Sequence, residues 1–206
     1  MVLGVTGGIA AGKSMVTETF RQMGAAVVSA DQLAREVVRP GTRVLEKLVE
    51  RFGRNILRAD GHLDRPALAS LVFSDARARE DLNAIMHPAI AELADRRLEE
   101  LKARQPELIV YEVPLLFETG AETRVDAVLV VTAGEDVQLR RLMHRDGLDE
   151  EQARARLEAQ MPQAQKVSRA DYVIDNSGSR DETLRQAREL FAKLTRRPAP
   201  CSPVPR

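Results

Sequence analysis

Hydrophobic residues occur along the chain in five short, continuous runs. Each run is rich in Val, Ile and Leu, and its apolar residues follow one another instead of alternating with polar ones. Continuous apolar runs of this length are typical of strands buried on both faces, as in a parallel sheet covered by helices. The predicted strands are Val2–Val5, Ala26–Val28, Leu108–Val113, Ala127–Val131 and Tyr172–Ile174.

The intervals between these runs carry apolar residues three and four positions apart, a spacing that predicts helices. Alternating strands and helices indicate an α/β fold, here a five-stranded parallel sheet with flanking helices. Asp60-Gly61-His62 and His87-Pro88 are expected to separate helices, because Gly and Pro disfavour the helix interior. The predicted helices are Val16–Met23, Gln32–Val38, Val44–Phe52, Arg65–Val72, Asp75–Ala84, Ile90–Arg104, Val137–Arg145, Glu150–Gln160 and Arg180–Leu194.

Two long intervals between strands indicate helical segments beside the sheet. About eighty residues separate the second run from the third, far more than a simple crossover requires. The interval between the fourth and fifth runs is helical and rich in arginine, and the C-terminal segment is rich in proline. The predicted organisation is one domain over residues 1–195, with a core of about 1–31, 106–137 and 168–195, a helical subdomain of about 32–105, a helical segment of about 138–167, and a disordered tail of 196–206.

The composition is that of an ordinary globular protein, with 44% hydrophobic and 30% charged residues, which excludes a disordered chain. Basic and acidic residues balance at 31 each, and only 3% are aromatic, so we expect no nucleic-acid partner. No apolar run approaches about 18 residues, so no membrane span is expected. Cys201 is the only cysteine, which agrees with a reducing cytoplasm. The oligomeric state stays open, with a monomer favoured.

The most informative motif is a glycine-rich loop directly after the first predicted strand. Residues 7–14 read GGIAAGKS and fit the pattern G-x-x-x-x-G-K-[ST] between a strand and a helix. In this pattern backbone N–H groups face an anion, Lys13 can reach the β- and γ-phosphates, and the Ser14 hydroxyl can bind Mg²⁺. The motif predicts binding of a nucleoside triphosphate with Mg²⁺. The expected nucleotide-binding residues here are Gly8, Ile9, Ala10, Ala11, Gly12, Lys13, Ser14 and Met15.

Two acidic residues follow predicted strands and are candidates for chemistry. Asp31 comes just after the second strand, at the sheet edge where open α/β sheets bind ligands, and could accept a proton from a hydroxyl or bind a metal through water. It could also cap the helix that begins at Gln32. Glu112 ends the third strand and is either a second acidic group near Mg²⁺ or a structural carboxylate bound by backbone groups.

Arg141 and Arg145 lie four residues apart, on one face of a predicted helix. Two adjacent guanidinium groups favour an anionic ligand, and arginine binds phosphate with two parallel hydrogen bonds. The alternative is a solvated helix face paired with Asp146 or Glu150.

Two further polar residues have weaker signals. His87 precedes Pro88 at the expected helix break, and a lone histidine does not indicate catalysis. Asn176 follows the last strand and could hydrogen-bond an adenine edge, although its position before Gly178 favours a turn.

Several short motifs occur in a fixed order over Val2–Leu194. They are Thr6–Ile9, Ala30-Asp31 with Ala34-Arg35, Leu82–Pro88 (LNAIMHP), Val113–Glu118 (VPLLFE), Arg141 with Arg145-Asp146, Ala159–Pro162 (AQMP) and Ala170–Asn176 (ADYVIDN). Taken together, these motifs resemble those of the dephospho-coenzyme A kinase family. The glycine-rich loop is shared by many kinases, whereas the later motifs in this order are far more specific.

The resemblance implies a P-loop kinase fold with a coenzyme A-binding helical subdomain and a mobile lid in the arginine-rich interval. It implies transfer of the γ-phosphate of ATP to the ribose 3′-hydroxyl of dephospho-coenzyme A, the last step of coenzyme A synthesis. Asp31 is then the general base, with Lys13 and Arg141 as further catalytic residues. The implied acceptor-binding residues are Thr6, Arg35, His87, Leu115, Leu116, Phe117 and Glu118, and the implied additional nucleotide-binding residues are Arg145 and Asn176.

Two positions depart from the family pattern. Met15 stands where the family usually has Thr, so one auxiliary hydroxyl is missing, and Ser29 stands where it often has an additional Asp. Two other functions compete with this one. A kinase for another small acceptor would share the glycine-rich loop, and a nucleotide-controlled switch would typically add a base-reading Asn-Lys-x-Asp motif, which the chain lacks.

Overall fold

A computed structural model describes residues 1–73 and 75–195 and contains a five-stranded sheet. All of its strand pairs are parallel, in the order β2-β3-β1-β4-β5. The predicted parallel sheet is therefore confirmed, while the predicted tail and Cys201 lie outside the described residues. The strands are β1 (Val2–Gly7), β2 (Ala26–Ser29), β3 (Ile109–Glu112), β4 (Ala127–Thr132) and β5 (Tyr172–Asp175).

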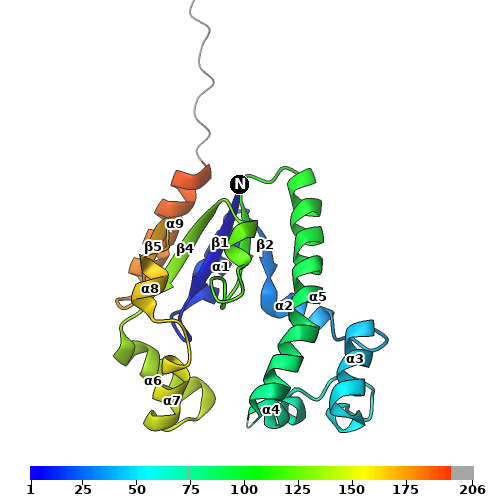
Figure 1. Cartoon of the computed structure of the whole chain (residues 1–206). Coiled ribbons are helices and arrows are strands. Elements are labelled where there is room, and N and C mark those ends of the chain that lie inside the picture. Colours follow the sequence, from blue (N-terminus) through cyan, green and yellow to red (C-terminus); the bar gives the residue numbers. More distant parts are fainter. Residues whose placement is uncertain (74, 196–206) are drawn as a thin grey trace, which may run out of the picture.

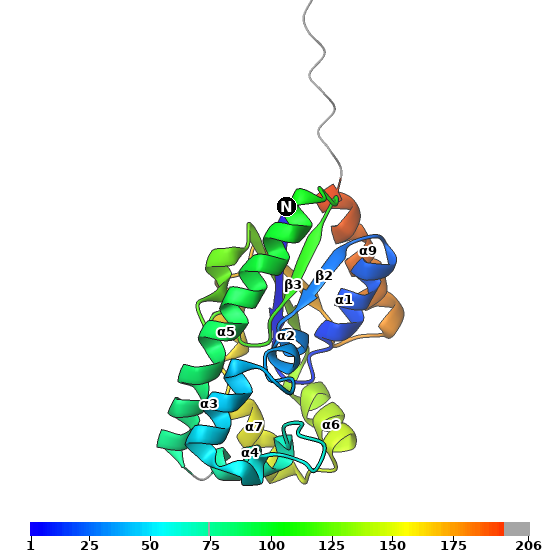
Figure 2. The ribbon, with the colours of Figure 1, turned by 90° about the vertical axis from the view of Figure 1, so that its right-hand side faces the viewer.

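Helices cover both faces of the sheet (Figure 2). Neighbouring residues of one strand point to opposite faces, so Ile109 joins one hydrophobic cluster and Val110 joins the other. Burial on both faces explains why the strands read as continuous apolar runs. The helices on one face are α1 (Lys13–Gln22) and α9 (Arg180–Thr195), and those on the other are α2 (Ala30–Glu36) and α5 (Ala76–Ala103).

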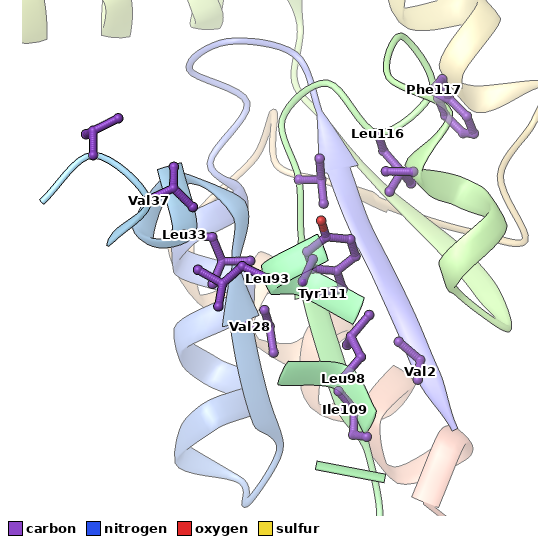
Figure 3. Close-up of a cluster of buried hydrophobic side chains, with 14 of the residues drawn as sticks. Val2, Val28, Leu33, Val37, Leu93, Leu98, Ile109, Tyr111, Leu116 and Phe117 are labelled. Carbon is purple, nitrogen blue, oxygen red and sulfur yellow. The ribbon is translucent and has the colours of Figure 1, made fainter. Parts of the chain in front are cut away.

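The larger hydrophobic cluster joins the sheet to α2 and α5 (Figure 3). Ile109 and Tyr111 of β3 meet Leu33 from α2 and Leu93 and Leu98 from α5 in this cluster. Burying a side chain of this size stabilises the fold by about 1.5–3 kcal/mol. The cluster therefore fixes α2 and α5 beside the carboxyl ends of β2 and β3.

Most of the remaining helices gather at the end of the molecule toward which β1 runs, in two groups on opposite sides, whereas α8 lies beside the sheet (Figure 1). Their starts follow ordinary capping rules: the Thr42 side chain accepts from Leu45 N–H, and Asp149 forms a capping box with Gln152. One group contains α3 (Arg43–Phe52) and α4 (Arg65–Phe73), and the other contains α6 (Glu135–Asp146) and α7 (Glu150–Glu158), followed by α8 (Gln163–Val167).

The predicted break at His87-Pro88 is wrong, because α5 runs without interruption through both residues. Proline at position 88 removes one helical hydrogen bond, to the carbonyl of Ala84. Pro88 and Ala84 are both exposed, so water can satisfy that carbonyl. Residues on both sides of the proline pack in the larger hydrophobic cluster, Leu82 and Met86 before it and Leu93 after it, and this packing holds the helix together.

Candidate active site

The glycine-rich loop connects β1 to α1 and is packed tightly against its surroundings. A β-carbon at Gly7 would lie 2.2 Å from the carbonyl oxygen of Val131, and one at Gly12 would lie 2.0 Å from Nδ2 of Asn176. Gly12 also has a φ of 94°, which favours glycine. These two glycines are therefore required by the close approach of neighbouring groups.

Lys13 points into the loop and is mostly buried. Its Nζ donates to the carbonyl oxygens of Gly7 at 2.8 Å and Gly8 at 3.2 Å. Burial lowers the pKa of Lys13 to about 8, and the nearby Glu112 carboxylate opposes this shift. The ammonium group thus lies against the loop that the motif predicts to bind phosphate.

Asp31 and Glu112 both interact electrostatically with this lysine. Burial raises the pKa of Glu112, Lys13 lowers it, and the negative charge of Asp31 raises it again, so the three groups are electrostatic neighbours. Asp31 is an exposed residue in the first turn of α2, while Ser29 holds the N-cap position. The helix-cap interpretation of Asp31 is therefore wrong, because α2 starts at Ala30, two residues earlier than expected.

A cavity of about 510 Å³ adjoins the loop, between α1 and α6. Arg141 lines it and donates to the carbonyl oxygens of Ala10 at 3.5 Å and Asn176 at 3.2 Å. Arg145 also lines it, although its side chain is exposed and forms two hydrogen bonds to Asp146. The full lining is Ala10, Gly12, Lys13, Ser14, Arg140, Arg141, His144 and Arg145, of which Arg140 and His144 were not singled out from the sequence.

Asn176 packs against the glycine-rich loop and is hydrogen-bonded to it. Its Nδ2 donates to the carbonyl oxygen of Ala11 at 2.7 Å, and its Oδ1 accepts from the Thr183 hydroxyl at 2.9 Å. The residue is only 2% exposed. Both polar atoms of the amide thus have protein partners, and the side chain braces the loop. The turn interpretation missed this role, because Thr183 and Ala11 are revealed as partners only by the fold.

A second cavity, of about 380 Å³, lies between α2, α5 and the loop that follows β3. The predicted general base, Asp31, lines it together with two of the predicted acceptor-binding residues, His87 and Leu115. Most of its wall is apolar, and Tyr111, Thr119 and Arg124 add polar groups that were not anticipated from the sequence. Tyr111 could have been placed on this face of the sheet, because successive side chains of a strand point to opposite faces and Tyr111 lies two residues after Ile109. Arg124 belongs to a short 3₁₀ turn without a sequence signal.

The other predicted acceptor-binding residues lie behind this wall or outside it. Leu116 and Phe117 are buried in the larger hydrophobic cluster and hold the loop in place. The Thr6 hydroxyl donates to the carbonyl oxygen of Pro114 at 3.1 Å, and Glu118 forms an ion pair with Lys166 at 2.8 Å. Four of the predicted contacts therefore shape the loop that forms the wall of the cavity.

Arg65 interacts electrostatically with both Arg35 and Asp31. Burial lowers the pKa of Arg65, the adjacent Arg35 guanidinium lowers it further, and Asp31 opposes both effects. Arg65 begins α4 and donates to the carbonyl oxygen of Ala34 at 3.2 Å. Sequence reasoning proposed Arg35 and missed Arg65, because 30 positions separate them. Such a pair favours an anionic ligand.

Oxygen donors suited to Mg²⁺ are present beside the glycine-rich loop. Ser14 is exposed and lines the larger cavity, and Asp31 and Glu112 are electrostatic neighbours of Lys13. Mg²⁺ prefers few protein oxygens together with phosphate oxygens and water. In residues 1–73 and 75–195 no group of three or more His, Cys, Asp or Glu side chains forms a metal site, and no helix is long and apolar enough to cross a membrane.

Comparisons with known proteins agree with these features. A family model for dephospho-CoA kinase matches residues 1–182. The dephospho-CoA kinase of Syntrophotalea carbinolica is 56% identical over 94% of this chain and 92% of its own length. The dephospho-CoA kinase of Geobacter sulfurreducens is 48% identical over 93% of this chain and 98% of its own length.

Solved structures show the same arrangement. Protein TT1252 from Thermus thermophilus has a TM-score of 0.80 at 39% identity and covers 95% of this chain and 98% of its own. Dephospho-CoA kinase from Campylobacter jejuni has a TM-score of 0.74 at 30% identity, with coverages of 94% and 96%. A shikimate kinase from Bacteroides thetaiotaomicron shares the fold alone, at 14% identity and a TM-score of 0.55. By the family model and by these relatives, the chain belongs to the dephospho-CoA kinase family of phosphotransferases.

Proposed function

We propose that this chain transfers the γ-phosphoryl group of ATP to the ribose 3′-hydroxyl of dephospho-coenzyme A, giving coenzyme A and ADP. One observation carries this proposal: the linings of the two cavities contribute a pair of interacting opposite charges. Lys13 lines the cavity beside the glycine-rich loop, Asp31 lines the apolar cavity, and the two side chains are electrostatic neighbours. A phosphoryl donor and a hydroxyl acceptor would then meet where these two residues lie.

The nucleotide side supplies positive charge and backbone donors. Lys13 and the N–H groups of the glycine-rich loop would hold the β- and γ-phosphates, and Arg141 would neutralise charge that develops on the transferred group. Ser14 would hold Mg²⁺, and the Asp31 and Glu112 carboxylates, which interact electrostatically with Lys13, would supply further oxygen donors. When bound, Mg²⁺ neutralises charge shared between the β- and γ-phosphates.

The acceptor side supplies a base and a site for anions. Asp31 would orient the acceptor hydroxyl and take its proton, while an O–P bond forms to the γ-phosphorus and the bond to the ADP oxygen breaks. Dephospho-coenzyme A carries a pyrophosphate, which suits the pair formed by Arg35 and Arg65. Its apolar portions suit the wall that contains Leu115 and Tyr111.

The direct test is mass spectrometry of dephospho-coenzyme A after incubation with the protein, ATP and Mg²⁺. We expect the acceptor to gain one phosphoryl group. Lys13→Ala should lower turnover by roughly 100-fold or more, because it removes a charge that stabilises the transition state. If the wild-type protein binds ATP and the acceptor gains nothing, the acceptor assignment fails and other small hydroxyl compounds must be tried.

A second variant tests the base. Asp31→Asn keeps the size of the side chain but cannot take a proton, so transfer should fall by roughly 100-fold or more while nucleotide affinity changes little. Asp60→Asn is the matched control, because Asp60 is an exposed residue of the turn before α4 and lines neither cavity. Near-normal transfer by Asp31→Asn would show that another group accepts the proton.

A further inference from the structure

The backbone N–H and the backbone carbonyl of Ile9, in the glycine-rich loop, are each hydrogen-bonded by a glutamine side chain. Nε2 of Gln138 donates to the carbonyl oxygen of Ile9 at 2.8 Å, and the backbone N–H of Ile9 donates to Oε1 of Gln160 at 2.9 Å. Because a backbone carbonyl can only accept and a backbone N–H can only donate, the orientation of each glutamine amide is fixed. Gln138 therefore acts as a donor and Gln160 as an acceptor.

Both glutamines belong to the lid predicted over residues 138–167, of which Gln138 is the first residue. Gln138 is on α6 and is 6% exposed, and Gln160 follows the end of α7. Between them α6 and α7 share a small hydrophobic cluster, and the side chains of Ile9 and Ala10 pack against it. The lid thus contacts the loop through both hydrogen bonds and apolar packing.

We propose that Gln138 and Gln160 are positioning residues, which clamp the two peptide groups that flank Ile9 and so fix the part of the loop that would bind phosphate. The residue after Ile9, Ala10, has a φ of 58°, an unfavourable conformation for alanine. Neighbouring contacts must therefore maintain it, and Arg141 holds the Ala10 carbonyl on the other side. Without the clamp, the backbone N–H groups that follow would no longer point together at one anion.

Gly8 provides an independent observation. Its φ lies outside the left-handed range, so its backbone conformation does not require glycine. A β-carbon there would nevertheless lie 2.6 Å from Nε2 of Gln138. The glycine leaves space for the clamp, and Gly8→Ala would displace the flexible Gln138 amide before it disturbed any backbone atom. We therefore expect Gly8→Ala to have the same effect as loss of the Gln138 hydrogen bond.

The inference rests on nucleotide binding within the proposed function, and its test exploits the opposite polarity of the two hydrogen bonds. A glutamate can still accept from Ile9 N–H, so Gln160→Glu should bind ATP more tightly than Gln160→Leu. A glutamate carboxylate cannot donate to the Ile9 carbonyl oxygen and repels it, so Gln138→Glu should bind ATP more weakly than Gln138→Leu. Each leucine variant should raise the dissociation constant of a non-hydrolysable ATP analogue by roughly 5- to 10-fold, the usual effect of one lost hydrogen bond.

The measurements are calorimetric binding of that analogue to the full chain and steady-state kinetics with both substrates. A positioning role predicts a higher KM for ATP with an unchanged KM for dephospho-coenzyme A, whereas a purely structural role lowers the active fraction and leaves both KM values unchanged. Gln165→Glu is the matched control, because Gln165 is exposed on the same segment and its side chain makes no hydrogen bond within the described residues. Gly8→Ala combined with Gln138→Leu should be no worse than either single change.

Two results would overturn the clamp. One is that both glutamate variants rank on the same side of their leucine counterparts, and the other is wild-type affinity for the analogue in both leucine variants. Lys13→Ala separates this failure from failure of the proposed function. If Lys13→Ala weakens binding of the analogue and the leucine variants do not, only the clamp is wrong.

Discussion

Gly12 is the residue at which the glycine-rich loop, α1 and the end of β5 come together. Its φ of 94° disfavours any other residue, and the amide of Asn176 fills the space that a β-carbon would need. That amide also holds Ala11 and Thr183, so one substitution would disturb three hydrogen-bonding groups. The conformational and steric contributions can be separated, because the chain contains a second glycine with nearly the same φ.

We predict that Gly12→Ala is much more damaging than Gly24→Ala. Gly24 has a φ of 101° and no atom within 4 Å of the site of its β-carbon, so Gly24→Ala should cost only the conformational term of about 1–2 kcal/mol in the free energy of unfolding. Gly12→Ala adds displacement of the buried Asn176 amide, which should cost about 1–3 kcal/mol more. Urea unfolding of the wild-type protein and the two variants measures both losses of stability.

Nucleotide affinity provides the second measurement for this pair. Gly24→Ala should bind ATP as the wild-type protein does, because Gly24 follows α1 at the end remote from the loop. Gly12→Ala should bind it at least roughly 10-fold more weakly, because the support of Ala11 is lost. Equal losses of stability and equal affinities in the two variants would mean that the Asn176 contact contributes nothing.

These residues also show what a sequence can predict about a site. The glycine-rich loop could be identified because all of its functional groups lie within eight consecutive positions. Asn176 could not be understood in the same way, since its partner Ala11 is 165 residues away. The contact depends on the strand order, which places β5 two strands from β1, and no local pattern encodes that order.

At the scale of secondary structure, α5 is the element that the sequence pattern described least well. Proline is unfavourable inside a helix by about 3 kcal/mol, and local propensity therefore predicts two helices. Packing overrides that preference, because the residues on both sides of Pro88 contribute to one cluster. The strands were predictable because burial on both faces leaves a continuous apolar signature, whereas the continuity of α5 depends on contacts that only the fold supplies.

We predict that Pro88→Ala makes the protein more stable and a poorer kinase. The change restores a hydrogen-bond donor for the Ala84 carbonyl and should raise the free energy of unfolding by about 1–2 kcal/mol, measured by urea unfolding. Pro88 lines the proposed acceptor cavity beside His87, so loss of the proline ring should change that wall and raise the KM for dephospho-coenzyme A by a few fold.

Pro66→Ala is the control for this change. Pro66 lies in the first turn of α4, where a backbone N–H has no partner within the helix, so its replacement should alter the free energy of unfolding by less than about 0.5 kcal/mol. An unchanged or lower stability for Pro88→Ala would indicate that α5 is already relaxed around the proline.

At the scale of the whole molecule, the segment after α7, within the predicted lid, contacts both the glycine-rich loop and the loop that follows β3. Gln160 binds Ile9 of the glycine-rich loop, and Lys166 binds Glu118 and the Pro114 carbonyl in the loop that walls the acceptor cavity. The Pro114 carbonyl also accepts from Thr6 at the end of β1. A few polar contacts thus connect the lid, the nucleotide loop and the acceptor loop.

The Lys166–Glu118 ion pair is asymmetric, and this asymmetry gives the last prediction. The Lys166 side chain is fully buried, whereas that of Glu118 is 24% exposed. Removing Glu118 leaves a buried ammonium with only the Pro114 carbonyl at 3.4 Å, and uncompensated buried charge is costly. Removing Lys166 leaves a carboxylate that water can reach. Glu118→Ala should therefore lower the free energy of unfolding by about 3 kcal/mol, and Lys166→Met by only about 1 kcal/mol.

The double variant distinguishes this argument from simple addition. Once Lys166 is methionine, loss of Glu118 should cost little, so the double variant should be more stable than Glu118→Ala alone. Thermal or urea unfolding of the four proteins completes the cycle, and additive losses would contradict the buried-charge explanation. The same contact holds the loop that lines the proposed acceptor cavity. Glu118→Ala should therefore also raise the KM for dephospho-coenzyme A more than the KM for ATP, because the ion pair couples the segment around Lys166 to acceptor binding.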